Sequence, residues 1–391
     1  MKMQVLMMTI GLLILSLVAQ PVWWFGLIYE WWTADRRIKR ERRAFGSAVY
    51  SDKFEVRHFV LLSLFWGLVM SVVSFAVGMT VPIGWWVCYS VFALIAIIFG
   101  LGSRLPITIF VGTVVLYDWF DKASFSHPVM ALLRQLGFSR QPVKIAVLIM
   151  LLSAVLFLLS RWLKKTGGRF ASPKIFAQKR GKLIAGYPFN ELLVVPTLVL
   201  IPGDFISAHL AFWPVLSLGG THVTPLFLPI LLGLHLTIFK QNPRMAFKRL
   251  AKSFLVLSIL VLIGGIVALL SQPAAWIILG LAYVGYIGCL LKTRWHDRRQ
   301  SFWYSKVDHG VRVLGIKPET PAAKMDIQVG DIITTCNQQP VHSETSFYEA
   351  LLSDPTYCHL KIQTPEGDLK VTETAIFDGS PHEIGIVMFK D

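Results

Sequence analysis

The chain has 391 residues, of which 54% are hydrophobic and only 16% charged, and its mean hydropathy is +0.58. This composition excludes a soluble protein and indicates a membrane protein. The net charge of +15 is uneven, because residues 1–305 carry 31 basic and 10 acidic side chains whereas residues 306–391 carry 7 and 13. The basic side chains lie in short loops between apolar segments, where membrane topology and anionic lipid explain them better than nucleic acid does.

Nine segments are apolar and long enough to be candidate membrane spans, for which roughly 20 residues are needed. In chain order they are Val5–Tyr29, His58–Gly78, Trp85–Leu101, Leu105–Trp119, Val143–Leu163, Leu192–Pro214, Val223–Phe239, Phe254–Leu270 and Ala274–Leu291. The third and fourth are short and nearly continuous, and the sixth contains Pro196, Pro202 and Gly203, so it should be kinked or broken. We therefore predict a polytopic α-helical membrane domain of eight or nine spans over residues 1–291.

The loops between these segments predict the orientation of the chain. Loops 36–43, 161–182, 240–252 and 292–299 carry six, eight, five and four basic residues, whereas loops 79–84, 217–221 and 271–273 carry no charge. Basic loops face the cytoplasm, so the carboxyl-terminal region should lie there too. An aromatic linker over residues 292–308 should hold that region close to the bilayer. The same basic clusters should attract anionic lipid.

The last 80 residues have the pattern of a small soluble α+β domain. β-branched residues around Val311 and in the run 332–337 favour strands, and Pro321 begins a short helix. Ser343 begins a second helix with apolar residues at helical spacing, and a hairpin turns at residues 364–368. The predicted order is strand, short helix, strand, long helix, hairpin and closing strand.

This order, with PETPAA at 318–323, GDII at 330–333 and EIGIVMF at 383–389, resembles a bacterial PDZ domain of the circularly permuted kind. The resemblance implies a PDZ domain over residues 309–391, in which a peptide adds as an extra strand to an open edge and residues 379–385 receive its carboxylate. The implied groove residues are Ile384, Gly385, Ile386 and Val387 on the closing strand and Phe347, Ala350 and Leu351 on the long helix. Asn337-Gln338 departs from the usual Asn-Gly turn, and a domain used only for packing is the alternative.

No catalytic, metal-binding or cofactor-binding motif occurs in the sequence. The only His-Glu pair, His382-Glu383, has Ile386 where a zinc protease needs its second histidine, and a phosphate-binding glycine loop is missing. We therefore expect no enzymatic activity and no cofactor. Asp204 and His209 lie in a predicted span, and ionisable groups there also fit a transporter or channel with a regulatory PDZ domain.

The plan of the whole chain resembles the MinJ family of cell-division topological determinants. The likeness rests on many spans with short loops, one carboxyl-terminal permuted PDZ domain, RRIKRER at 36–42 and EIGIV at 383–387. It implies a non-enzymatic adaptor of the bacterial cell membrane, enriched at septa and poles, that bridges the scaffold DivIVA to MinD. MinD acts with MinC to inhibit FtsZ assembly, and other divisome membrane proteins are further partners. A transporter, or a scaffold for a separate membrane protease, remains the alternative.

Overall fold

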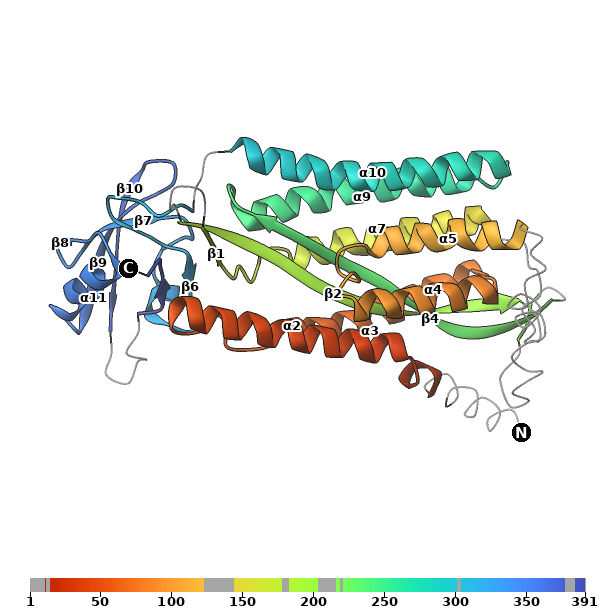
Figure 1. Cartoon of the computed structure of the whole chain (residues 1–391), viewed down its shortest axis with the longest axis horizontal. Helices are drawn as coiled ribbons and strands as arrows, with labels where there is room; N and C mark the ends of the chain where they lie inside the picture. Colours follow the sequence, from red (N-terminus) through yellow and green to blue (C-terminus); the bar gives the residue numbers. More distant parts are fainter. Residues whose placement is uncertain are drawn as a thin grey trace.

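The computed structural model describes residues 11, 15–122, 144–177, 183–202, 216–218, 221–300, 304–376 and 384–390. Within these residues, an elongated helical body carries a small β-rich domain at one end (Figure 1).

The helical body contains seven described helices that are labelled in Figure 1. They are α2 (Pro21–Phe45), α3 (Phe54–Val77), α4 (Ile83–Ile98), α5 (Pro106–Lys122), α7 (Ile145–Thr166), α9 (Pro243–Val267) and α10 (Gln272–Arg299). Proline in the first turn begins α2, α9 and α10, where its missing amide hydrogen costs nothing. Among the described helices, α3, α7, α9 and α10 are long and apolar enough to cross a membrane, and α4 and α5 are shorter. This count is lower than the eight or nine spans that we predicted.

The described residues of two predicted spans, Leu192–Pro214 and Val223–Phe239, form strands and not helices. In the described part of these segments, β2 (Leu183–Pro202) pairs in antiparallel register with β4 (Thr221–Ile238). Proline explains the difference, since it lacks an amide hydrogen and breaks a helix. Pro196 lies opposite Pro229 in the ladder, and the neighbouring valines and threonine favour a strand.

The β2–β4 hairpin runs along the body between two groups of helices (Figure 1). Helices α2, α3 and α4 lie on one side, and α5, α7, α9 and α10 on the other. At Gly67 of α3, an added Cβ would lie 2.8 Å from the Pro196 carbonyl oxygen, so helix and strand are in close contact. A non-helical backbone is tolerated at membrane depth only where protein surrounds it. The helices on both faces meet that requirement.

Two short strands complete this sheet at opposite edges. Strand β1 (Lys174–Ala177) pairs with β2, and β3 (Leu216–Leu218) pairs with β4, giving the order β1-β2-β4-β3. The carboxyl ends of α2, α7 and α10 and the amino end of α9 lie toward the β-rich domain (Figure 1). The basic segments at these helix ends therefore gather on one end of the molecule.

The β-rich domain has the predicted order of elements. It comprises β5 (Val311–Arg312), β6 (Gly315–Ile316), the 3-10 helix η2 (Pro321–Lys324), β7 (Ile332–Cys336), β8 (Gln339–Pro340), α11 (Glu344–Leu352), β9 (Tyr357–Gln363), β10 (Leu369–Ala375) and β11 (Ile386–Val387). Ser343 and Ser346 form a reciprocal capping box that begins α11. At the turn, Asn337 and Gln338 adopt φ of +46° and +67°, and the Asn337 side chain accepts from the His359 amide (2.9 Å). That bond supports the turn although glycine is absent. Helix α10 continues to Arg299, through residues that we predicted to be linker.

Candidate peptide groove

The closing strand is held along one edge by β6 and by the residues next to it. The Leu314 amide donates to the Val387 carbonyl (2.7 Å), and the Lys317 amide donates to the Gly385 carbonyl (2.8 Å). Backbone groups of alternate residues in a strand point to opposite edges. The N–H and C=O groups of Ile386 should therefore face the other edge, where an added strand would pair.

Gly385 occupies a position that only glycine fits. Its φ is +90°, and an added Cβ would lie 2.1 Å from the Thr320 hydroxyl oxygen. The Thr320 hydroxyl itself donates to the Lys317 carbonyl (2.8 Å). The left-handed glycine thus brings the chain into β11 against a fixed side chain.

Six of the seven predicted groove residues lie on the facing elements of the PDZ-like domain. Gly385 precedes β11, and the side chains of Ile384, Ile386, Phe347, Ala350 and Leu351 are buried in one hydrophobic core. Helix α11 and the closing strand therefore share this core. At the amino end of α11, a recess of about 10 Å³ lies between Ser343, Glu344 and Phe389. That volume holds about one water molecule, so the recess has no room for a bound side chain.

Val387, the seventh predicted residue, lies on the opposite face of the strand. It packs with Phe389, Val49, Tyr187 and Tyr304 in a separate hydrophobic cluster. Val49 and Tyr187 belong to the helical body, so this cluster joins the PDZ-like domain to the body. We call it the docking cluster. The Val387 side chain therefore packs against the helical body and does not line the predicted groove.

Hydrogen bonds add to the docking cluster. The Tyr187 hydroxyl donates to the Leu314 carbonyl (2.7 Å), next to the point where Leu314 holds β11. The Ala185 amide donates to the Tyr304 carbonyl (2.8 Å), and the Lys306 amide donates to the Leu183 carbonyl (3.1 Å). Burial raises the pKa of the Tyr304 phenol, so it stays neutral at physiological pH. The PDZ-like domain is thus fixed to strand β2 of the body.

We did not predict this docking from the sequence, although a signal was present. Residues 384–389 are apolar at both odd and even positions, apart from Gly385, and a strand with two apolar faces is buried on both. We assigned residues of both faces, Val387 included, to the peptide groove and none to a contact with the helical body.

A buried ion network is connected to the docking cluster through Val49. It includes residues of the segment 36–43, which we predicted to be a basic loop. The Arg37 guanidinium donates to both carboxylate oxygens of Glu55 (2.5 and 3.2 Å) and to Glu41 (3.1 Å). Glu41 also accepts from the Val49 amide (2.8 Å) and from the Ser172 hydroxyl. The network ties α2 to α3, to the loop between them and to the segment before β1. Arg37 and Glu41 are structural core residues and not surface charges.

Several residues that we singled out lie outside the described parts of the chain. Residues 379–383 of the predicted carboxylate loop, with the His382-Glu383 pair, are among them. Asp204 and His209, which motivated the transporter alternative, are also outside the described residues. Within the described residues, three or more His, Cys, Asp or Glu side chains do not come together as a metal site.

Comparisons with known proteins match the carboxyl-terminal domain to a family and the whole chain to curated relatives. A PDZ domain family model matches residues 290–363. The chain is 29% identical over 381 residues to the cell division topological determinant MinJ of Bacillus subtilis (strain 168), covering 95% of this chain and 92% of that protein. It is 26% identical over 386 residues to a probable cell division topological determinant MinJ of Lacticaseibacillus paracasei, covering 97% and 98%. No solved structure matches the chain.

Proposed function

Because the chain is homologous to MinJ proteins along nearly its whole length and carries a PDZ domain, we propose that it is a non-enzymatic membrane adaptor in division-site selection. The role in cell-division topology comes from the relatives' names. The observation that supports an adaptor is the docked PDZ domain. One face of its closing strand packs against the helical body, and the other face packs against α11.

The adaptor is multi-pass, with the PDZ domain in the cytoplasm. The apolar helices supply the spans, and the gathering of basic helix ends beside the PDZ domain supports this orientation, since basic segments stay on the cytoplasmic side. A docked domain has little freedom to leave the membrane surface. Its effective concentration toward other membrane-bound proteins is therefore high, and modest groove affinity suffices.

The partners in this proposal are DivIVA, which would bring the adaptor to septa and poles, and MinD, which the adaptor would recruit together with MinC. A peptide segment of one partner would pair with the free edge of β11 and place side chains against α11. Anionic lipid would assist through the basic helix ends. Further membrane proteins of the division machinery would join the same assembly.

The test is localisation of a fluorescent fusion in dividing rod-shaped cells that lack the native gene. We expect the full chain to concentrate at septa and poles and to prevent the minicells or filaments that the deletion produces. A fusion that lacks residues 310–391 should show whether the helical body or the PDZ domain directs the protein to septa and poles, and which of the two recruits MinD. A uniform membrane signal together with normal division in the deletion strain would refute the proposal.

A further inference from the structure

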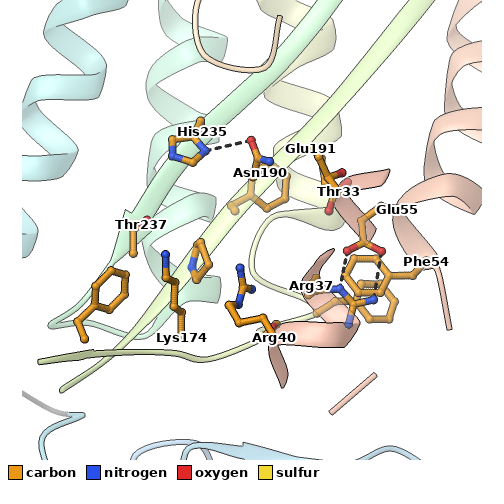
Figure 2. Close-up of a pocket in the computed structure, with 15 residues that line it drawn as sticks. Thr33, Arg37, Arg40, Phe54, Glu55, Lys174, Asn190, Glu191, His235 and Thr237 are labelled. Carbon is orange, nitrogen blue, oxygen red and sulfur yellow. Dashed lines mark hydrogen bonds and ion pairs between the residues drawn. The ribbon is translucent and has the colours of Figure 1, made fainter. Parts of the chain in front are cut away.

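A cavity of about 290 Å³ lies in the helical body near its PDZ-bearing end (Figure 2). Its walls come from α2, the first turn of α3, β1, and the paired strands β2 and β4. Since about 10–15 Å³ of such volume holds one water molecule, the cavity has room for a polyatomic group. The proposed adaptor function does not use this cavity.

The two carboxylates that line the cavity already have partners. Glu55 is bound by Arg37 through two hydrogen bonds, of 2.5 and 3.2 Å. Glu191 lies 3.4 Å from Nδ1 of His58. Glu55 therefore already has a cationic partner, and Glu191 has a polar one.

Two cations, by contrast, point into the cavity without an acidic partner. Figure 2 shows the Arg40 guanidinium and the Lys174 ammonium entering the space from α2 and β1. Among the described residues, neither has a carboxylate within ion-pair distance. Nε of Arg40 is buried and lacks a hydrogen-bond partner, and the Lys174 ammonium lies over the Phe176 ring, 5.0 Å from its centroid. A buried cationic donor without an acceptor is unfavourable, so an oxyanion would stabilise it.

Neutral polar groups line the opposite wall of the cavity. Nδ1 of His235 is 3.0 Å from Oδ1 of Asn190, and the two side chains lie across from Arg40 and Lys174 in Figure 2. The Thr237 hydroxyl adds a further group that can donate or accept. An anion with several oxygens could therefore bind to cations on one side and neutral groups on the other.

The surrounding surface indicates the depth of the cavity in the membrane. Trp31 and Trp32, next to the lining residue Thr33, are 51% and 45% exposed. Lys53 lies over the Trp31 ring and Arg36 over the Trp32 ring, 4.1 and 3.4 Å from the centroids. Exposed tryptophans paired with cations are typical of the membrane–water interface, where lipid phosphates lie. From these observations we infer that the cavity binds the phosphate group of an anionic ligand between Arg40 and Lys174, either a phospholipid headgroup or a soluble phosphate ester.

The test compares Arg40→Gln/Lys174→Gln with Arg42→Gln/Arg43→Gln in the purified full chain. The control also removes two positive charges, both from the end of α2 that carries Arg40, but its arginines are exposed and do not line the cavity. Native mass spectrometry would measure retention of phosphatidylglycerol, with phosphatidylcholine as the uncharged reference. Thermal unfolding with and without glycerol phosphate would measure binding of a soluble ester.

We expect wild type to retain phosphatidylglycerol selectively, and the cavity variant to bind it roughly tenfold more weakly, because charge-assisted hydrogen bonds to phosphate are lost. The control variant loses only the general attraction of the basic α2 end for anionic lipid, so its loss should be clearly smaller than that of the cavity variant, and its response to glycerol phosphate should match wild type. Stabilisation by glycerol phosphate without lipid retention, lost in the cavity variant, would support the site and identify a soluble ligand. If the double variant fails to fold, Lys174→Gln alone, at a partly buried position, should still show a smaller loss. Equal losses in cavity and control variants, or folded cavity variants that bind like wild type, would overturn the inference.

Discussion

At the scale of single residues, Arg37 links several elements at the PDZ-bearing end of the body. Its guanidinium is the partner of two buried carboxylates, Glu41 and Glu55. Removing one member of a buried ion network leaves the others unpaired, at a cost of about 3–5 kcal/mol. Arg37→Ala should therefore lower the thermal midpoint in detergent strongly, whereas Arg42→Ala, at an exposed position of the same helix, should change it little. Similar midpoints for the two variants would contradict a structural role for Arg37.

Gly385 allows a second test at this scale, because Gly367 provides a matched reference. Both glycines have positive φ, +90° and +100°, but a Cβ at Gly367 would meet nothing within 4 Å. Gly367→Ala should cost about 1–3 kcal/mol from backbone strain alone. Gly385→Ala should cost clearly more, since it also displaces Thr320 and the start of β11. Chemical unfolding of the two variants would measure the difference, and equal losses would show that the contact with Thr320 is unimportant.

At the scale of elements, the proposed groove depends on the free edge of β11. Proline at position 386 removes an amide hydrogen that faces this edge and leaves the bonds of Gly385 and Val387 to the neighbouring residues in place. Ile386→Pro should abolish recruitment of the partner that uses the groove, whereas Ile386→Val keeps the amide and should retain it. Pull-down from cells that carry each variant, with circular dichroism as the check on folding, would measure this. A folded Ile386→Pro variant that still recruits every partner would count against the groove.

The elements also show what the sequence could and could not predict. The order of the PDZ domain was predictable because its turns, its capping serine and its strand alternation are local signals. The β2–β4 hairpin was not, since an uninterrupted apolar run reports burial and not the period of a helix or strand. Pro196 and Pro202 indicated a broken helix, but pairing with β4 is a long-range event that local patterns do not specify. Arg37 was misread for the same reason, because the partner Glu55 lies on another helix.

At the scale of the whole molecule, the docking of the PDZ domain onto β2 is the feature that joins the two halves. Tyr187 provides both the packing and the hydrogen bond to Leu314. Truncating a buried aromatic residue costs about 3–5 kcal/mol, whereas losing a single hydrogen bond costs about 1 kcal/mol. Tyr187→Ala should therefore release the domain, and Tyr187→Phe should only weaken the docking.

Limited trypsin digestion would report this release, because the Lys306 amide is bonded to Leu183 only while the domain is docked. We expect cleavage after Lys306 to be slow in wild type, intermediate in Tyr187→Phe and fast in Tyr187→Ala. The Tyr357→Ala variant replaces an exposed tyrosine of the same domain and should be cleaved at the wild-type rate. If the position of the domain matters for the proposed adaptor, cells that carry the Tyr187→Ala variant should also form misplaced septa, although the groove is intact. Unchanged digestion in Tyr187→Ala would mean that the two halves are held together by other contacts.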